Sequence, residues 1–142
     1  MTGRLRSLLQ TIDSKLFDHL ESLNLQFEEF GMRWMNCLFT REFSNNCLLR
    51  LWDTYLSQED GFEGFHVYVC VVMLVHYSEF LRERDFSDCI THLLYLPVSE
   101  WTSDTLEPIL SQAFIFTTLY EGSPSHLKNN NQPSSINHNP TT

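Results

Sequence analysis

Positive charge is scarce in this sequence of 142 residues. Nine lysines and arginines stand against eighteen aspartates and glutamates, which gives a formal net charge of -9 with neutral histidines. Such a charge repels phosphate backbones and anionic membrane surfaces, so the sequence argues against nucleic acid as a partner. An acidic or a basic-faced protein partner stays open.

Long hydrophobic segments are also missing. The longest apolar run, residues 67–75, has nine residues between two histidines, whereas a helix that crosses a bilayer needs about 20. The N-terminal residues carry arginines but only a short apolar run, which is not the pattern of a secretory signal peptide. We therefore expect a cytoplasmic protein without a transmembrane segment.

The common signatures of enzyme and metal sites do not occur. There is no glycine-rich phosphate loop, no G-x-S-x-G nucleophile elbow and no H-E-x-x-H zinc motif. His66 and His76 share an expected helix, but the rise of about 1.5 Å per residue separates them too far for one metal ion. No cofactor is expected. The cysteines form no C-x-x-C pair, and we interpret them as buried free thiols: Cys37, Cys47, Cys70 and Cys89.

What the sequence does contain is helical periodicity. Apolar residues recur at steps of three and four from Leu5 to Leu23, as in an amphipathic helix, and the same spacing returns further along the chain. Ser44, Asp85 or Ser87, and one of residues 102–104 are suitable helix caps, and Pro108 is expected only in a first turn. The fold class is all-α, with about six helices: 5–23, 27 to 41–43, 44–55, 65–81, 85–96 and 102–120.

The valine-rich segment 65–81 is ambiguous. Valine favours strands, but odd- and even-numbered positions of the segment are both apolar, so it lacks the alternation of a half-buried strand. Seventeen residues without glycine or proline exceed a normal strand of about 5 to 6 residues. We interpret the segment as a buried helix, with a central strand as the alternative.

The C-terminal end differs in composition from the rest. Residues 122–142 are rich in Asn, Ser and Pro and contain no aromatic residue, so little there can bury apolar surface. We expect one folded domain over residues 5–121 and a disordered tail over 122–142.

Two neighbouring segments, residues 33–43 and 49–55, carry the most specific pattern. Arg50 and Asp53 lie three residues apart, where a guanidinium and a carboxylate can pair on one helix face while Trp52 points into the core. Taken alone, this pattern is that of a structural clasp between two helices. The carboxylate groups at 28–29, 59–63 and 83–88 are interpreted as solvated surface charges.

Several short motifs follow one another along the chain: Phe30-x-x-x-Trp34, Arg41-Glu42-Phe43, Arg50-x-Trp52-Asp53, Gly61-Phe62, Phe65-His66-Val67-Tyr68-Val69-Cys70 and Asp85-Phe86. Together, these motifs resemble the C-terminal half of the TBC domain, which occurs in GTPase-activating proteins for Rab GTPases. The Trp-Met-Asn and Phe-His-x-Tyr-Val-Cys sequences are most similar to the Golgi-associated branch of the family. The resemblance spans roughly residues 9–120. It rests on residues that we expect to be structural: Trp34, Arg41, Glu42, Phe43, Arg50, Trp52, Asp53, Phe65 and Tyr68.

The resemblance implies a helical, V-shaped regulator that speeds GTP hydrolysis by a bound Rab protein. TBC domains supply an arginine and a glutamine in trans, from Ile-x-x-Asp-x-x-Arg and Tyr-x-Gln motifs in their N-terminal half. Neither motif occurs in this sequence, and Gln58 lies one residue too far from Tyr55 to match. No catalytic residue is therefore expected here.

Two main hypotheses follow. The first is a partial TBC domain of a Rab GTPase activator in vesicle traffic. It lacks its N-terminal lobe, has a Rab-family small GTPase as its partner and is not catalytic alone. The second is a non-catalytic module that binds a Rab or another partner. An unrelated helical scaffold is a third reading. The resemblance places the protein in the cytoplasm, at the periphery of the Golgi or another endomembrane.

Overall fold

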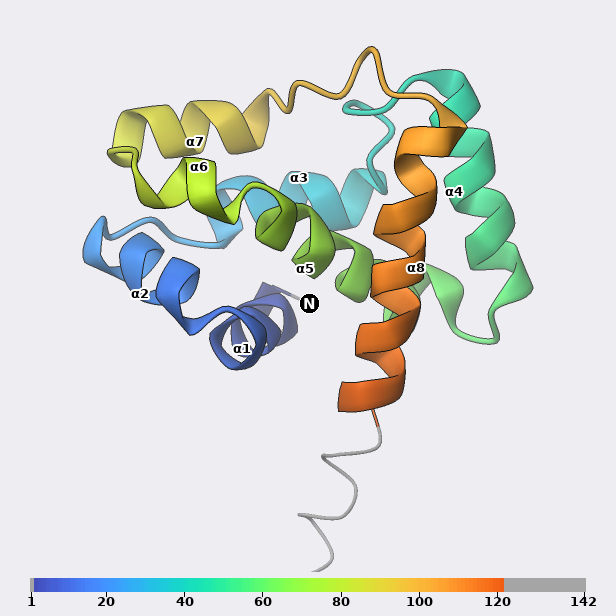
Figure 1. The fold of residues 1–142 in the computed structure, drawn as a ribbon, viewed down its shortest axis with the longest axis horizontal. Helices are drawn as coiled ribbons and strands as arrows, with labels where there is room; N and C mark the ends of the chain where they lie inside the picture. Colours follow the sequence, from blue (N-terminus) through green and yellow to red (C-terminus); the bar gives the residue numbers. More distant parts are fainter. Residues whose placement is uncertain (1, 122–142) are drawn as a thin grey trace, which may run out of the picture.

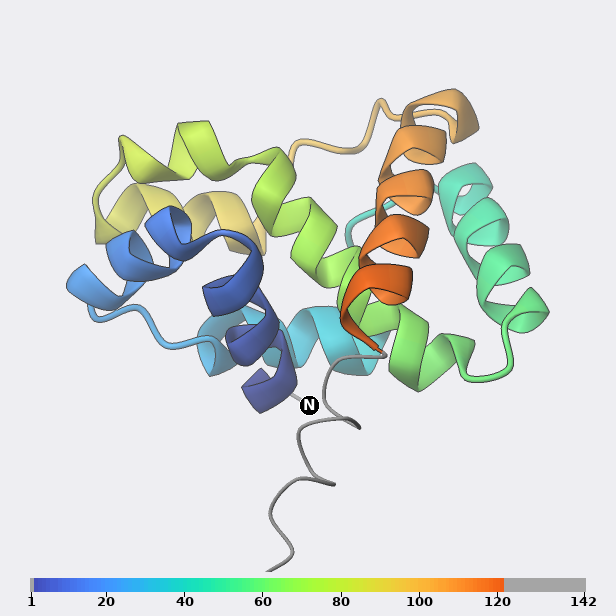
Figure 2. The same ribbon diagram turned by 60° about the horizontal axis from the view of Figure 1, so that its bottom comes forward.

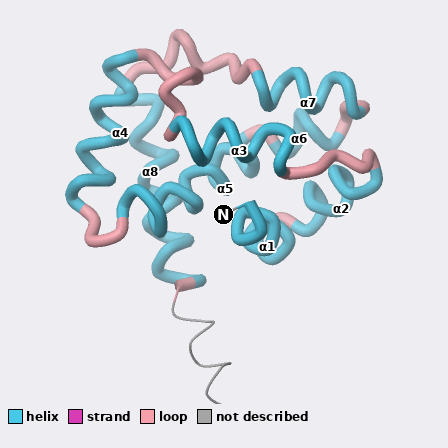
Figure 3. The backbone as a smooth tube through the Cα atoms, turned by 180° about the vertical axis from the view of Figure 1, so that it is seen from behind, coloured by secondary structure: helices cyan, strands magenta, loops and turns pink. Residues whose placement is uncertain are grey.

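A computed structural model describes residues 2–121 of the chain. Within that range every regular element is a helix, as the tube of Figure 3 shows. The proposed disordered tail, 122–142, lies outside the described residues. The elements in chain order are α1 (Thr2–Ile12), α2 (Ser14–Ser22), α3 (Glu28–Cys37), α4 (Asn45–Ser57), the π-helix η1 (Gly61–Phe65), α5 (His66–His76), α6 (Ser78–Arg82), α7 (Phe86–Leu94) and α8 (Ser103–Tyr120).

Helix α5 is the centre of the fold (Figure 1). Nine successive residues, from His66 to Leu74, are buried, because α1, α3 and α8 pack around the helix. Figure 2 shows α1 and α8 on either side of it. The valine-rich segment is therefore a buried helix and not a strand. A helix that is apolar all round is stable only when neighbours cover every side.

The prediction of an all-helical fold is confirmed, but two expected helices are divided. Asp13 separates α1 from α2 because its carboxylate accepts a hydrogen bond from Leu16 N at 3.1 Å and starts a new helix. Tyr77 separates α5 from α6. None of the helices in residues 2–121 is long and apolar enough to cross a membrane.

Two helix boundaries differ from expectation. Helix α3 ends at Cys37 rather than near residues 41–43, because Leu38 and Phe39 have φ values of 49° and 63° and turn the chain out of the helix. Pro108 is not in a first turn, since α8 begins at Ser103. It lies on the exposed side of the helix, where water can hydrate the carbonyl that its missing N–H leaves free.

The predicted caps are right in position and only partly in bonding. Asp85 caps α7 and accepts from Asp88 N at 2.9 Å. Ser44 and Thr102 occupy the N-cap positions of α4 and α8, but neither hydroxyl accepts a hydrogen bond from a backbone N–H of its helix. The geometry of these positions therefore follows from extended backbone rather than from hydroxyl capping.

The expected loop after α4 is short, and η1 follows it. A Cβ atom placed on Gly61 would lie 2.0 Å from the carbonyl oxygen of Tyr55. Only glycine allows the chain to pass this close to the end of α4. Gly61 thereby fixes where α5 begins, and with it the position of His66.

Candidate functional site

The residues of the family pattern gather mainly around the junction of α3 and α4. Trp34 of α3 is fully buried, and its Nε1 donates a hydrogen bond to Leu93 O of α7 at 3.0 Å. Its ring packs against Phe30 and Phe39 at centroid distances of 5.0 and 5.3 Å. Trp34 therefore ties α3 to α7 and to the turn that follows α3.

His66, at the start of α5, is the hub of a buried hydrogen-bond network. Its Nε2 lies 2.9 Å from the backbone oxygen of Trp34, and its Nδ1 contacts the Tyr55 hydroxyl of α4. Because a carbonyl oxygen can only accept, Nε2 carries the proton. Nδ1 then accepts from the Tyr55 hydroxyl. One imidazole thus links α3, α4 and α5.

The ionisation of this network makes it unsuitable for nucleophilic chemistry. Burial lowers the pKa of His66 to about 4, although the hydrogen bond to the Trp34 carbonyl works in the opposite direction. Burial also raises the pKa of Tyr55 and of Cys70, whose Sγ lies 3.5 Å from His66 Nε2. At neutral pH Cys70 is therefore a thiol beside a neutral imidazole, not a thiolate.

Glu42 and Arg33 form a second link, between α3 and the turn before α4. Glu42 Oε1 lies 3.0 Å from Arg33 Nε, and only 1% of the glutamate side chain is exposed. Neither Glu42 oxygen accepts a hydrogen bond from any other residue in the described range. Burial raises the pKa of Glu42, and the Arg33 guanidinium opposes that rise. The pair holds the turn at the cost of a poorly solvated carboxylate.

Arg50 does not pair with Asp53 as the spacing suggested. Its Nε lies 2.6 Å from Glu107 Oε1 of α8, and it also donates to the Thr54 hydroxyl. Asp53 is exposed and forms no ion pair within residues 2–121. Trp52 is half-buried at the rim of the core, with its Nε1 3.5 Å from Leu38 O. Arg50 therefore joins α4 to α8 rather than stabilising one turn.

The remaining residues of the pattern are mostly packing residues. Phe43 is buried between Phe39 and Trp101. Phe65 packs on Phe114 of α8 at 4.7 Å, and Tyr68 accepts a hydrogen bond from Arg4 at 3.4 Å. In contrast, Arg41 is exposed.

The cluster is built to hold helices together. In the part of the chain that the structure describes, no group of three or more His, Cys, Asp or Glu side chains is arranged around a metal position. Cys47, Cys70 and Cys89 are buried free thiols, whereas Cys37 is half-buried. Sequence reasoning missed the joint role of His66 and Tyr55. The available signal was a histidine that opens an otherwise apolar helix, because a buried imidazole needs hydrogen-bond partners.

Comparison with known proteins decides the family. The family model of the Rab-GTPase-TBC domain matches residues 2–82, which is more than half of the chain. The chain belongs to the Rab-GTPase-TBC domain family. The residues from α1 to α6, including the whole network around His66, fall inside the matched range.

Individual relatives match a larger share of the chain. The GTPase-activating protein gyp1 of Schizosaccharomyces pombe is 41% identical over 127 residues, which cover 89% of this chain and 25% of the relative. Human TBC1 domain family member 22A is 37% identical over 125 residues, or 87% of this chain and 24% of the relative. The chain thus spans about a quarter of the length of these curated relatives.

A solved structure shows the same arrangement of helices. The crystal structure of the Ypt/Rab-GAP domain of Gyp1p superposes with a TM-score of 0.81 at 41% sequence identity. The match covers 84% of this chain but only 37% of that chain. The 142 residues therefore correspond to part of a TBC domain.

Proposed function

We propose that these residues form the C-terminal lobe of a TBC domain in a GTPase activator for Rab-family GTPases, and that they do not accelerate GTP hydrolysis alone. The observation that carries the proposal is the combination of a close structural match to part of a Ypt/Rab-GAP domain with a sequence that contains neither finger motif. The resemblance assigns both fingers to the other half of the domain.

The exposed apolar residues support a partial domain. On α8, Ile115 and Leu119 are 51% and 61% exposed, and on α4 Leu49 and Leu56 are 62% and 72% exposed. Large apolar side chains that remain accessible on neighbouring helices are typical of surfaces that another protein segment covers. This is the surface expected of one lobe of a larger domain.

The buried network gives the lobe its function in this proposal. An arginine finger stabilises charge on the transferring phosphoryl group only when it is held in place, and the gain is about 10³ to 10⁵ in rate. The network around His66, with the Glu42–Arg33 and Arg50–Glu107 pairs, fixes four helices, α3, α4, α5 and α8, relative to one another. The lobe is a rigid support for a catalytic half and for the GTPase.

The sequences of the motifs further support a role in vesicle traffic. We infer that the protein acts in the cytoplasm, at the periphery of the Golgi, because the Trp-Met-Asn and Phe-His-x-Tyr-Val-Cys segments are most similar to that branch of the family. Fluorescence microscopy of the tagged chain beside a Golgi marker tests this location, and a uniformly diffuse signal would oppose it.

The test of function is GTP hydrolysis by a panel of purified Rab proteins with and without the 142-residue chain, with binding measured in the same samples. We expect binding of at least one Rab without acceleration. Acceleration would refute the account of missing fingers, and alanine substitution of each exposed arginine would then locate the residue responsible. Binding of a non-Rab protein only would favour the alternative, a non-catalytic partner-binding module.

A further inference from the structure

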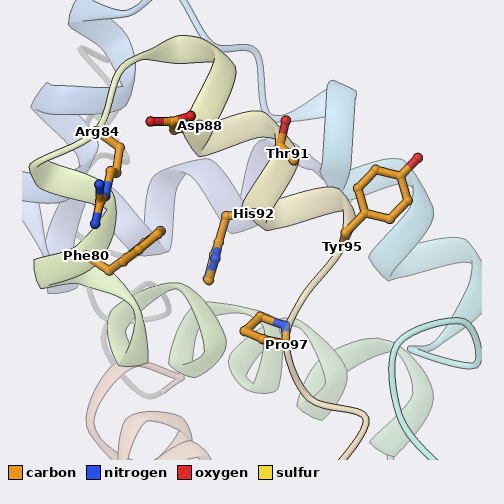
Figure 4. A pocket seen from close by; sticks show the side chains of 7 residues that line it. All are labelled: Phe80, Arg84, Asp88, Thr91, His92, Tyr95 and Pro97. Carbon is orange, nitrogen blue, oxygen red and sulfur yellow. The ribbon is translucent and has the colours of Figure 1, made fainter.

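A hollow of about 410 Å³ lies between α6 and α7, away from the network around His66 (Figure 4). Figure 4 shows Arg84 and Phe80 on one side of it, Tyr95 and Pro97 on the other, and His92 between them. Its volume falls within the roughly 300 to 1,000 Å³ of ligand sites in proteins, and a few polar groups converge on aromatic walls as they do in such sites.

The space beside the rings of Phe80, His92 and Pro97 forms a slot within the hollow. The His92 ring lies 4.5 Å from the centroids of both Tyr77 and Phe80. Burial lowers the pKa of His92, so this ring is neutral at pH 7 and behaves as part of the aromatic wall. Tyr95 is 71% exposed, and the Arg33 guanidinium lies 5.8 Å from its ring centroid. The volume of the hollow suits a bulky side chain rather than a bare ion.

One end of the slot carries a cation, Arg84. The Arg84 guanidinium lies 4.4 Å from the centroid of the Phe80 ring. Arg84 forms no ion pair with any carboxylate in residues 2–121, although Asp88 lines the same hollow one helical turn away. A guanidinium that is supported on a ring and free of an internal partner is suited to pair with a carboxylate from outside.

We propose that this hollow binds a peptide segment of a partner protein in which a bulky apolar side chain is next to a glutamate or aspartate. The apolar side chain packs against the rings of Phe80, His92 and Pro97, and the neighbouring carboxylate pairs with Arg84. The Asp88 carboxylate accepts from the main-chain N–H groups of the peptide. Because Asp88 repels a doubly charged phosphate, the site favours a single carboxylate.

The proposal is independent of the proposed GTPase-activating role, since none of the residues proposed to contact the peptide belongs to the network that supports the family motifs. The test uses the isotopically labelled 142-residue chain and three capped dipeptides, phenylalanyl-glutamate, phenylalanyl-glutamine and phenylalanyl-lysine amides. Binding is followed by the amide shifts of residues 84–97. We expect the glutamyl peptide to bind about two- to fivefold more tightly than the glutaminyl one, the strength of an exposed ion pair.

Charge variants provide the control. Arg84→Gln removes the preference for the glutamyl peptide, and Arg84→Glu transfers it to the lysyl peptide. The matched variant Arg41→Gln removes an exposed arginine elsewhere and leaves the preference unchanged. Equal binding of all three peptides, no binding, or a preference that survives Arg84→Gln would overturn the proposal. Amide shifts that depend on protein concentration without peptide would assign the hollow to a second copy, and would overturn it too.

Discussion

The hydrogen bond between Tyr55 and His66 offers a clean test of the network. Tyr55→Phe removes one hydroxyl from a side chain that is 1% exposed and leaves the ring in place, so no cavity of consequence forms. His66 Nδ1 then loses its donor in a site that water does not reach. An unsatisfied buried acceptor costs about 1–3 kcal/mol, and we expect the free energy of unfolding to fall by that amount.

The assay is urea unfolding at pH 7, followed by circular dichroism. Tyr95→Phe is the matched control, because it removes the same hydroxyl from a residue that is 71% exposed and should change stability by less than about 0.5 kcal/mol. A double-mutant cycle with His66→Leu isolates the coupling between the two side chains. A Tyr55→Phe effect no larger than that of the control would refute the reasoning.

Three further predictions concern charge and backbone. Folding raises the pKa of Glu42, so its contribution to stability is full below its unfolded pKa and is lost as the pH rises through the folded value. Arg33→Gln should therefore destabilise the fold by about 3 kcal/mol at pH 7, where Glu42 is ionised, and by less at pH 4. Equal effects at the two pH values in urea unfolding would contradict this. Folding lowers the pKa of His66 to about 4, so the free energy of unfolding falls as the pH drops from about 6.5 toward 4. In an NMR titration the His66 ring should stay neutral down to about pH 4, and protonation near pH 6.5 would contradict its burial. Gly61→Ala places a methyl group against Tyr55 O and should lower the free energy of unfolding by more than about 3 kcal/mol. The control Gly3→Ala, in the open part of α1, should be neutral or stabilising. Equal melting temperatures of the two variants would contradict this, because they would show that η1 adapts to the methyl group.

The helices could be predicted because their apolar spacing reports burial directly. For the segment around α5, its length predicted a helix correctly although its valines favour a strand. A helix enclosed by α1, α3 and α8 can be valine-rich. The division at Asp13 was harder to predict, because an aspartate fits both the polar side of one long helix and the cap of a new one.

The site could be predicted as a set of residues but not as a geometry. The family pattern marked Trp34 and Arg50, yet their partners, Leu93 and Glu107, lie 59 and 57 residues further along the chain. Local spacing favoured Asp53 as the partner of Arg50 because it considers only one helix. The left-handed turn at Leu38 and Phe39 also had no sequence signal, since neither residue is glycine or asparagine.

GTP hydrolysis by a chimera tests the central claim most directly. The chimera joins the upstream part of the TBC domain of the Schizosaccharomyces pombe gyp1 protein to this 142-residue chain, in place of the segment to which the chain is 41% identical. We expect the chimera to accelerate GTP hydrolysis by a Rab protein, while the chain and the upstream part are each inactive alone. A folded chimera that leaves the hydrolysis rate unchanged, or a chain that accelerates hydrolysis without the upstream part, would contradict the account.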